Sequence, residues 1–222
     1  MKALLRIAFW GLGISALGTL PLGTINVAAM QISIAEGVWP ASLFGVGAAI
    51  IEVAYVRVSL VGISWIQHRA GLLRLMDWLA FAIVATLAVT SFMAASNPAQ
   101  AGKNVILNAD VHPFILGVTM SALNPMQIPF WFGWSTVLFS KGILQANGQQ
   151  FNWYSVGIGI GTLIGLAVFV IGGQVLLQNM HSHMNVVQYS IAAIFAVTAV
   201  VFLYKIIFNK GAAAALQAKE KV

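Results

Sequence analysis

The residue with the most evident capacity for chemistry is Glu52, an acidic side chain near the middle of the long apolar stretch 41–66. An ionised side chain at that depth in a membrane costs about 2.5–3.5 kcal/mol on insertion scales, so such residues commonly have a function. Removal from water favours the uncharged form of a carboxylic acid, which suits reversible protonation. A proton that moves down the membrane potential releases about 2.3 kcal/mol per 100 mV. Glu52 is therefore the predicted proton-coupling residue.

Small residues accompany Glu52 on one face of the predicted helix. Gly45, Ala48 and Ala49 precede it at helical spacing, so the acid is expected to face other helices. The structural alternative is an ion pair with Arg57. Five residues on a helix separate the two by roughly 140° and 7.5 Å along the axis, so direct pairing is poor. Arg57 is expected instead to extend toward the membrane surface or to reach another helix.

Two long apolar stretches are interrupted in the same way, by a proline beside polar residues. The first reads "LPLGTIN" around Pro21 and the second reads "ALNPMQIP" around Pro125. Proline removes a backbone donor, glycine adopts conformations that other residues avoid, and asparagine both donates and accepts hydrogen bonds. We predict helix breaks at Pro21 and Pro125 that expose polar backbone inside the membrane. The simpler alternative is two kinked helices in which Asn26 and Asn124 bind neighbouring helices.

A pair of breaks would suit a zwitterionic ligand, because an amino acid needs one partner for its carboxylate and another for its ammonium group. The N-terminal end of a broken helix attracts anions, and freed carbonyl oxygens attract cations. Glu52 would bind either the proton or the ammonium group, and this competition would couple the two. The predicted substrate-binding residues are Gly23, Thr24, Asn26, Asn124 and Gln127.

These residues must be positioned by membrane-spanning helices, since 60% of the 222 residues are hydrophobic and only 7% are charged. Such a composition is typical of an integral membrane protein. A spanning helix needs roughly 20 apolar residues. The predicted architecture is an all-α membrane protein with six transmembrane helices, at 7–34, 41–66, 77–95, 113–140, 154–178 and 186–208.

The two halves of the chain also resemble each other in sequence pattern. Both interrupted segments are followed by a glycine-rich segment, "WPASLFGVGAAI" after the first and "WYSVGIGIGTLI" after the second. Copies of three spans must lie in the membrane with opposite orientations, which is the inverted repeat of many secondary transporters. The predicted division is a first three-helix repeat (1–95), a periplasmic connecting loop (96–112), a second three-helix repeat (113–208) and a cytoplasmic tail (209–222).

Lysine and arginine indicate the orientation, because cytoplasmic loops retain positive charge during insertion. Of the eleven basic residues, nine lie on the side of the N-terminus, Lys103 lies on the other side and Arg57 lies within a span. Both termini are therefore predicted to be cytoplasmic. The net charge of +6 follows from this topology and does not indicate a nucleic-acid partner.

The chain resembles the LysE-type (lysine exporter, RhtB-like) amino-acid exporters over nearly its whole length. The resemblance is carried by two stretches, "PLGTINVAAMQISIAEG" and "SALNPMQIPFW". The resemblance implies a carrier in the bacterial cytoplasmic (inner) membrane that exports amino acids. The first family motif is usually Pro-Gly-Pro followed by Asn or Asp; here the second proline is missing, whereas Asn26 fits. Asn124 and Pro125 match the second motif. The acid that the family commonly has in its second helix lies about one turn before Glu52.

The leading interpretation is a secondary transporter that exports amino acids or similar small polar metabolites by proton antiport, and not an enzyme. One alternative is a divalent cation carrier, although hard cations favour several oxygen ligands and the spans contain few acids. Another is a non-transporting membrane scaffold or subunit, which should have no cavity reaching Asn26, Asn124 and Glu52. The chain has no cysteine, and the pair His181 and His183 is too small a ligand set to predict a metal site. No cofactor is predicted, and a homodimer is left open.

Overall fold

The structure is a computed structural model of the chain. It describes residues 2–20, 23–61, 70–96, 111–124, 127–145, 147–179 and 184–208, and this part contains helices and no strand. In chain order the helices are α1 (Lys2–Thr19), α2 (Thr24–Glu36), α3 (Val38–Val61), α5 (Ala70–Ser96), α6 (Pro113–Ala122), α7 (Gln127–Ser140), α8 (Gly148–Asn179) and α9 (Met184–Ile207).

Within the described residues, each of the six predicted segments consists mainly of helix. The segment 7–34 consists of α1 and α2, whose axes are inclined by 73°, and the segment 113–140 consists of α6 and α7. Both interruptions thus fall at the predicted places, while Pro21 and Pro125 themselves lie outside the described residues. The loop 97–110 and the tail 209–222 also lie outside them.

Length and hydropathy support fewer spans than the six predicted. Among the described residues, three helices are long and apolar enough to cross a membrane: α3, the segment Gly148–Leu176 of α8 and the segment Tyr189–Ile207 of α9. The bent pair α1 and α2 would make a fourth, whereas the apolar parts of α5 and α6 are shorter. The all-helical class is confirmed, and the number of spans is not established by this criterion.

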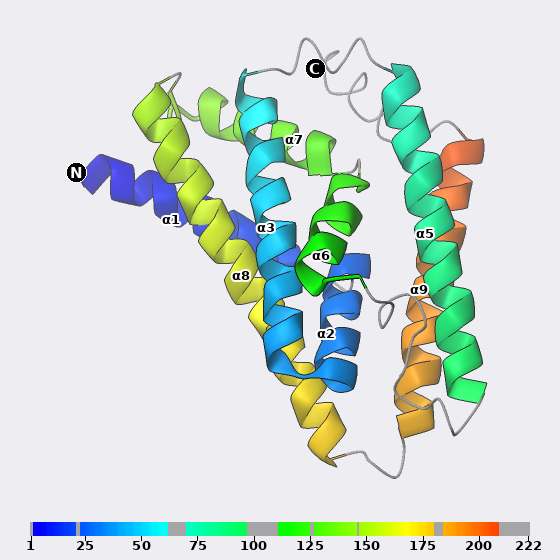
Figure 1. Ribbon diagram of the computed structural model, residues 1–222. Coiled ribbons are helices and arrows are strands. Elements are labelled where there is room, and N and C mark those ends of the chain that lie inside the picture. The colour runs from blue at the N-terminus through cyan, green and yellow to red at the C-terminus, as the bar shows by residue number, and fades with distance from the viewer. Residues whose placement is uncertain are drawn as a thin grey trace.

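The helices pack in two groups (Figure 1). In the larger group, α1 and α2 lie against α8, α6 and α7 lie against α3, and α3 contacts α8. The smaller group is the pair α5 and α9, which stands to one side and contacts the larger group through α2. The main apolar core joins α2, α3 and α8 to this pair, around buried side chains such as Ile32, Phe44, Leu87 and Phe195.

Glycine permits the closest helix crossings in the larger group. A Cβ atom at Gly47 on α3 would clash with the carbonyl oxygen of Phe114 on α6, and one at Gly117 would clash with that of Phe44. On the other side, a Cβ atom at Gly161 on α8 would clash with the carbonyl oxygen of Leu12 on α1. Backbones can approach this closely only where no side chain intervenes. The crossings of α3 with α6 and of α8 with α1 therefore require glycine.

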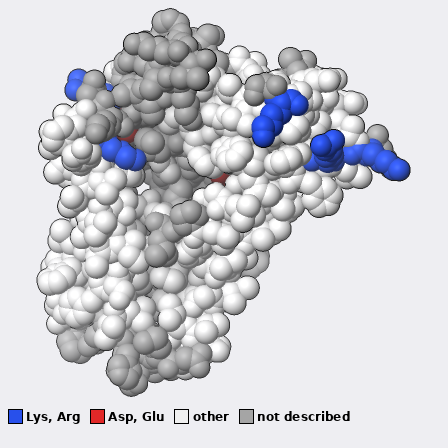
Figure 2. All heavy atoms as spheres, turned by 180° about the vertical axis from the view of Figure 1, so that it is seen from behind, with Lys and Arg blue, Asp and Glu red and all other residues white. Residues whose placement is uncertain are grey.

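The outer surface is largely apolar, with exposed valine, isoleucine, leucine and phenylalanine side chains along every long helix. Five tryptophans of the described residues are also exposed: Trp10, Trp39, Trp78, Trp134 and Trp153. Figure 2 shows lysine and arginine gathered toward one end of the molecule and a hollow between the two groups of helices. An extended apolar surface of this kind is typical of a protein embedded in a bilayer.

Candidate functional site

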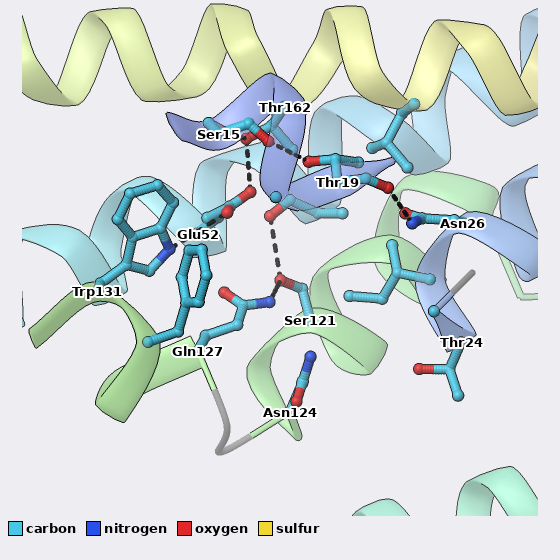
Figure 3. A pocket seen from close by; sticks show the side chains of 16 residues that line it. Ser15, Thr19, Thr24, Asn26, Glu52, Ser121, Asn124, Gln127, Trp131 and Thr162 are labelled. Carbon is cyan, nitrogen blue, oxygen red and sulfur yellow. Dashed lines mark hydrogen bonds between the residues drawn. The ribbon is translucent and has the colours of Figure 1, made fainter. Parts of the chain in front are cut away.

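The two interruptions border a single cavity of about 280 Å³. It is enclosed by the ends of α1, α2, α6 and α7, with α3 and α8 as its longer walls (Figure 3). All six residues predicted for substrate binding and proton coupling line it: Gly23, Thr24, Asn26, Glu52, Asn124 and Gln127. The volume is near the lower limit of ligand pockets, about 300–1,000 Å³, which suits a small molecule.

Glu52 lies on the α3 wall, and its carboxylate has two donors from different helices. Nε1 of Trp131 on α7 donates to Oε1 at 3.2 Å, and Oγ1 of Thr162 on α8 donates to Oε2 at 2.5 Å. The indole N–H can only donate, so Oε1 must remain an acceptor. An added proton would therefore belong on Oε2, the atom that faces Thr162.

Thr162 connects Glu52 to α1. Its Oγ1 lies 2.7 Å from Oγ of Ser15 and 3.0 Å from the carbonyl oxygen of Ile158. A hydroxyl group has one proton to donate and two lone pairs to accept with. While Thr162 donates to an ionised Glu52, Ser15 must be the donor to Thr162. If Oε2 were protonated it would donate to Thr162, whose own proton would turn to Ser15 or Ile158.

The N-terminal end of α2 forms one side of the cavity. Gly23 is the N-cap with extended backbone (φ −112°, ψ 166°), and it provides no side-chain cap. The first turn of a helix has backbone N–H groups without intrahelical partners, and these attract anions. Nδ2 of Asn26 donates to the carbonyl oxygen of Thr19, the last residue of α1. Asn26 thus ties the two helices together beside the cavity.

The opposite side is formed by the end of α6 and the start of α7. Nε2 of Gln127 donates to Oγ of Ser121 at 3.0 Å, and Ser121 donates to the carbonyl oxygen of Ala48 at 3.1 Å. Oε1 of Gln127 is buried without a hydrogen-bond partner among the described residues. A residue that lines the cavity therefore has an acceptor oxygen that no described group uses.

Arg57 does not pair with Glu52. It donates to Oδ1 of Asn152 on α8, which agrees with the expectation that it reaches another helix. Tyr55, on the same helix, donates to the carbonyl oxygen of Ala122, the last residue of α6. The freed carbonyl at the end of α6 is thus satisfied from α3, as that of α1 is satisfied by Asn26.

Sequence reasoning missed several residues of the cavity. Trp131 lies well inside the predicted span 113–140, away from the span ends where tryptophan is usually found in membrane proteins, and the structure buries it completely against Glu52. That departure was the signal that could have revealed it. Ser15 and Ser121 are both buried and line the cavity, but single serines in apolar helices have no distinctive spacing. Thr162 was recognisable only as one polar residue of the second glycine-rich segment.

Metal-ligating side chains are sparse around the cavity. Within the described parts of the chain, no group of three or more histidine, cysteine, aspartate or glutamate residues could bind a metal ion. Glu52 is the acidic residue that lines the cavity. The pair His181 and His183 lies outside the described residues.

The family model described as LysE type translocator matches residues 16–206, which include every residue that lines this cavity except Ser15. The chain belongs to this family. A Bacillus subtilis (strain 168) protein with the printed name "Putative amino acid efflux protein YcgF" is 28% identical over 165 residues, which are 74% of this chain and 77% of that protein. No solved structure matches the chain. This LysE-type chain is therefore a membrane translocator by family, as the resemblance implied.

Proposed function

We propose that this translocator exports amino acids or similar small polar metabolites across the bacterial inner membrane in exchange for protons. The family and the relative named for amino acid efflux support this class of substrate. The observation that carries the proposal is the cavity in which Glu52, both helix interruptions and a carbonyl oxygen without a partner meet.

In the proposed bound state, the substrate carboxylate lies at the N-terminal end of α2. Gly23 leaves the first turn without a side-chain cap, and Thr24 adds a hydroxyl group at the same point. The ammonium group lies toward Glu52, with Oε1 of Gln127 and the side chain of Asn124 as further oxygen partners. Opposite ends of a zwitterion then meet opposite charges.

The proton and the ammonium group compete for Glu52 in the proposed cycle. An ionised Glu52 binds the ammonium group and keeps its bonds from Trp131 and Thr162. After the substrate leaves on the outer side, a proton binds Oε2 and the hydroxyl of Thr162 turns away. Because one carboxylate serves both ligands in turn, movement of each depends on movement of the other.

We further propose that the chain forms six spans in a 3+3 inverted repeat, 1–95 and 113–208, with breaks at Pro21 and Pro125. The contact pattern supports this arrangement, since α1 and α2 lie against α8 as α6 and α7 lie against α3. The connecting loop 96–112 would be periplasmic, and the tail 209–222 cytoplasmic. The gathering of basic side chains at one end supports cytoplasmic termini (Figure 2).

The carrier proposal is favoured over a membrane scaffold by the same cavity. A scaffold has no need of a hollow that reaches Asn26, Asn124 and Glu52, because unfilled volume weakens packing. A cavity lined by one carboxylate also suits an ammonium group better than a divalent cation, which favours six or more oxygen ligands.

The test is counterflow in proteoliposomes preloaded with a mixed pool of neutral and basic amino acids, with and without a pH gradient. We expect the wild-type protein to exchange a subset of radiolabelled amino acids and to respond to the gradient. We expect Glu52→Gln to retain exchange at a lower apparent affinity, because the charge that binds the ammonium group is lost. The response to the gradient should disappear, because glutamine keeps an acceptor for Trp131 but cannot titrate.

The matched control is Glu36→Gln, which removes an acid at the end of α2 that does not line the cavity. This variant should respond to the gradient as the wild type does. Absence of exchange by folded wild-type protein would refute amino-acid transport. A full gradient response in Glu52→Gln would refute the proton role while leaving the substrate class standing.

A further inference from the structure

A second concave surface lies on the other side of α3 and α8. This groove has a volume of about 510 Å³ and is bordered by Val46, Ile50 and Arg57 on α3 and by Asn152, Val156 and Leu163 on α8. Its floor includes Gly159, whose Cβ position is 3.2 Å from Val53. Val46, Ile50, Val156 and Leu163 are all exposed. The groove is separate from the cavity of Glu52, since no residue lines both.

The length of this α3–α8 groove matches one leaflet of a bilayer. On α3 it extends from Val46 to Arg57, and on α8 from Asn152 to Leu163. Each range covers about 16 Å at 1.5 Å per residue. The hydrocarbon core of a bilayer is about 30 Å thick, so half of it is about 15 Å. The groove therefore extends about as far as one acyl chain reaches from the headgroup region to the midplane.

The groove is polar at one end only. Arg57 and Asn152 lie there together, near the last turn of α3 and the first turns of α8. The guanidinium group has five N–H donors, and its partner among the described residues is the side-chain oxygen of Asn152. Donors therefore remain available for a phosphate, the anion whose geometry guanidinium matches. At the opposite end the groove is bordered by Val46 and Leu163.

We propose that this groove is a phospholipid-binding site. One acyl chain lies between α3 and α8, and the phosphate accepts hydrogen bonds from Arg57. An anionic phospholipid binds more tightly than a zwitterionic one, because the charge of Arg57 has no carboxylate partner in the described structure. The site is independent of the substrate and proton proposed above, since its residues do not touch the cavity.

A lipid fits this groove better than a helix from a second copy of the chain. The groove has a volume of about 510 Å³, and Arg57 at its polar end has no carboxylate partner in the described structure, which favours an occupant with an anionic headgroup. A thin, flexible chain can fill that volume, and in a bilayer apolar chains are the surrounding solvent. The test below also detects the alternative, in which a helix from a second copy of the chain occupies the groove.

The test is native mass spectrometry of the full chain in mild detergent, with phosphatidylglycerol or phosphatidylcholine added. The wild-type protein should retain one phosphatidylglycerol molecule and less phosphatidylcholine. Arg57→Gln should lower the retained fraction of phosphatidylglycerol about tenfold, as expected for loss of a charge-assisted hydrogen bond. Arg57→Lys should retain an intermediate fraction. Val156→Trp should displace the lipid while Arg57 is still present.

Two matched controls accompany these variants. Arg74→Gln removes an exposed arginine on α5, and Val168→Trp adds the same bulk at an α8 position that is as exposed as Val156, 53% against 54%. Both should retain lipid as the wild type does. Equal retention in Arg57→Gln, Val156→Trp and their controls would overturn the proposal. So would a dimer that Val156→Trp converts to monomer without any loss of lipid.

Discussion

The two long walls of the cavity, α3 and α8, have the same framework and different chemistry. In the proposed repeat, Ala48 corresponds to Thr162, because each is the tenth residue of the glycine-rich segment that begins at Trp39 or Trp153. Ser121 on α6 donates to the carbonyl oxygen of Ala48, and Ser15 on α1 bonds the hydroxyl of Thr162. A buried serine of each first half-helix thus contacts the equivalent position of the opposite wall.

One helical turn further along, the walls differ most. Glu52 follows Ala48 on α3, and Leu166 follows Thr162 on α8. Both line the cavity, but Leu166 also belongs to the main apolar core, where it packs beside Gly45. Both walls therefore have a glycine crossing and a contact with a buried serine, whereas the acidic residue that lines the cavity lies on α3. A single proton site on one wall would give a defined stoichiometry to exchange.

The largest effect on stability is expected when an acidic residue is placed on α8 at the position equivalent to Glu52. Leu166→Glu should lower the free energy of unfolding by about 3 kcal/mol, because a carboxylate would replace an apolar side chain that packs in the main apolar core. Glu52→Gln should change it little, since an uncharged amide replaces a desolvated acid of the same shape. Tryptophan fluorescence during thermal unfolding in detergent measures both, with Leu166→Met as the volume-conserving control. Equal unfolding midpoints for Leu166→Glu and Leu166→Met would show that the walls are interchangeable.

A smaller effect is expected at the glycine crossings, where the walls should behave alike. Gly47→Ala and Gly161→Ala should each destabilise the protein by about 1–3 kcal/mol, because the added methyl group meets a backbone carbonyl on the neighbouring helix. Gly13→Ala on α1 is the control, since its Cβ position has nothing within 4 Å, and alanine favours helix there. Thermal unfolding of the three variants gives the comparison. Destabilisation at one crossing alone would contradict the proposed repeat.

Much of this framework was predictable from local pattern. Apolar length gave the positions of the helices, and the proline-containing stretches gave the interruptions at which Asn26 and Asn124 enter one cavity. Glu52 could be identified as a candidate site residue because an acidic side chain within an apolar stretch costs free energy in a membrane. These are local signals, which a single sequence contains in full.

Tertiary partners were not predictable in the same way. Nothing near Trp131 in the sequence indicates Glu52, since 79 residues separate them. The bond between Ser15 and Thr162 joins positions 147 residues apart. The length of α8 was also underestimated, because it begins at Gly148, six residues before the predicted 154. Three of those six residues are glutamine or asparagine and four of the six are exposed, so hydrophobicity alone does not mark them as part of a helix.

The smallest effects are expected at the two serines, and they separate framework from function. Ser15→Ala and Ser121→Ala should each lower the free energy of unfolding by about 1 kcal/mol, because each removes one buried hydrogen-bonding hydroxyl. Only Ser15→Ala should also change how exchange responds to a pH gradient, because Ser15 orients the hydroxyl of Thr162 that donates to Glu52. Ser121 instead holds Gln127 and the backbone of Ala48.

Unfolding midpoints and proteoliposome counterflow, measured on the same preparations, distinguish these contributions. Ser15→Thr is the control that restores a hydroxyl group, and it should recover the gradient response even if the added methyl group lowers stability. Equal changes in the gradient response for both alanine variants would mean that the two walls share the proton chemistry. A changed response in Ser15→Ala alone would place that chemistry on the chain of hydroxyl groups that leads from Ser15 through Thr162 to Glu52. The equivalent pair, Ser121 and Ala48, cannot form such a chain because Ala48 has no hydroxyl group.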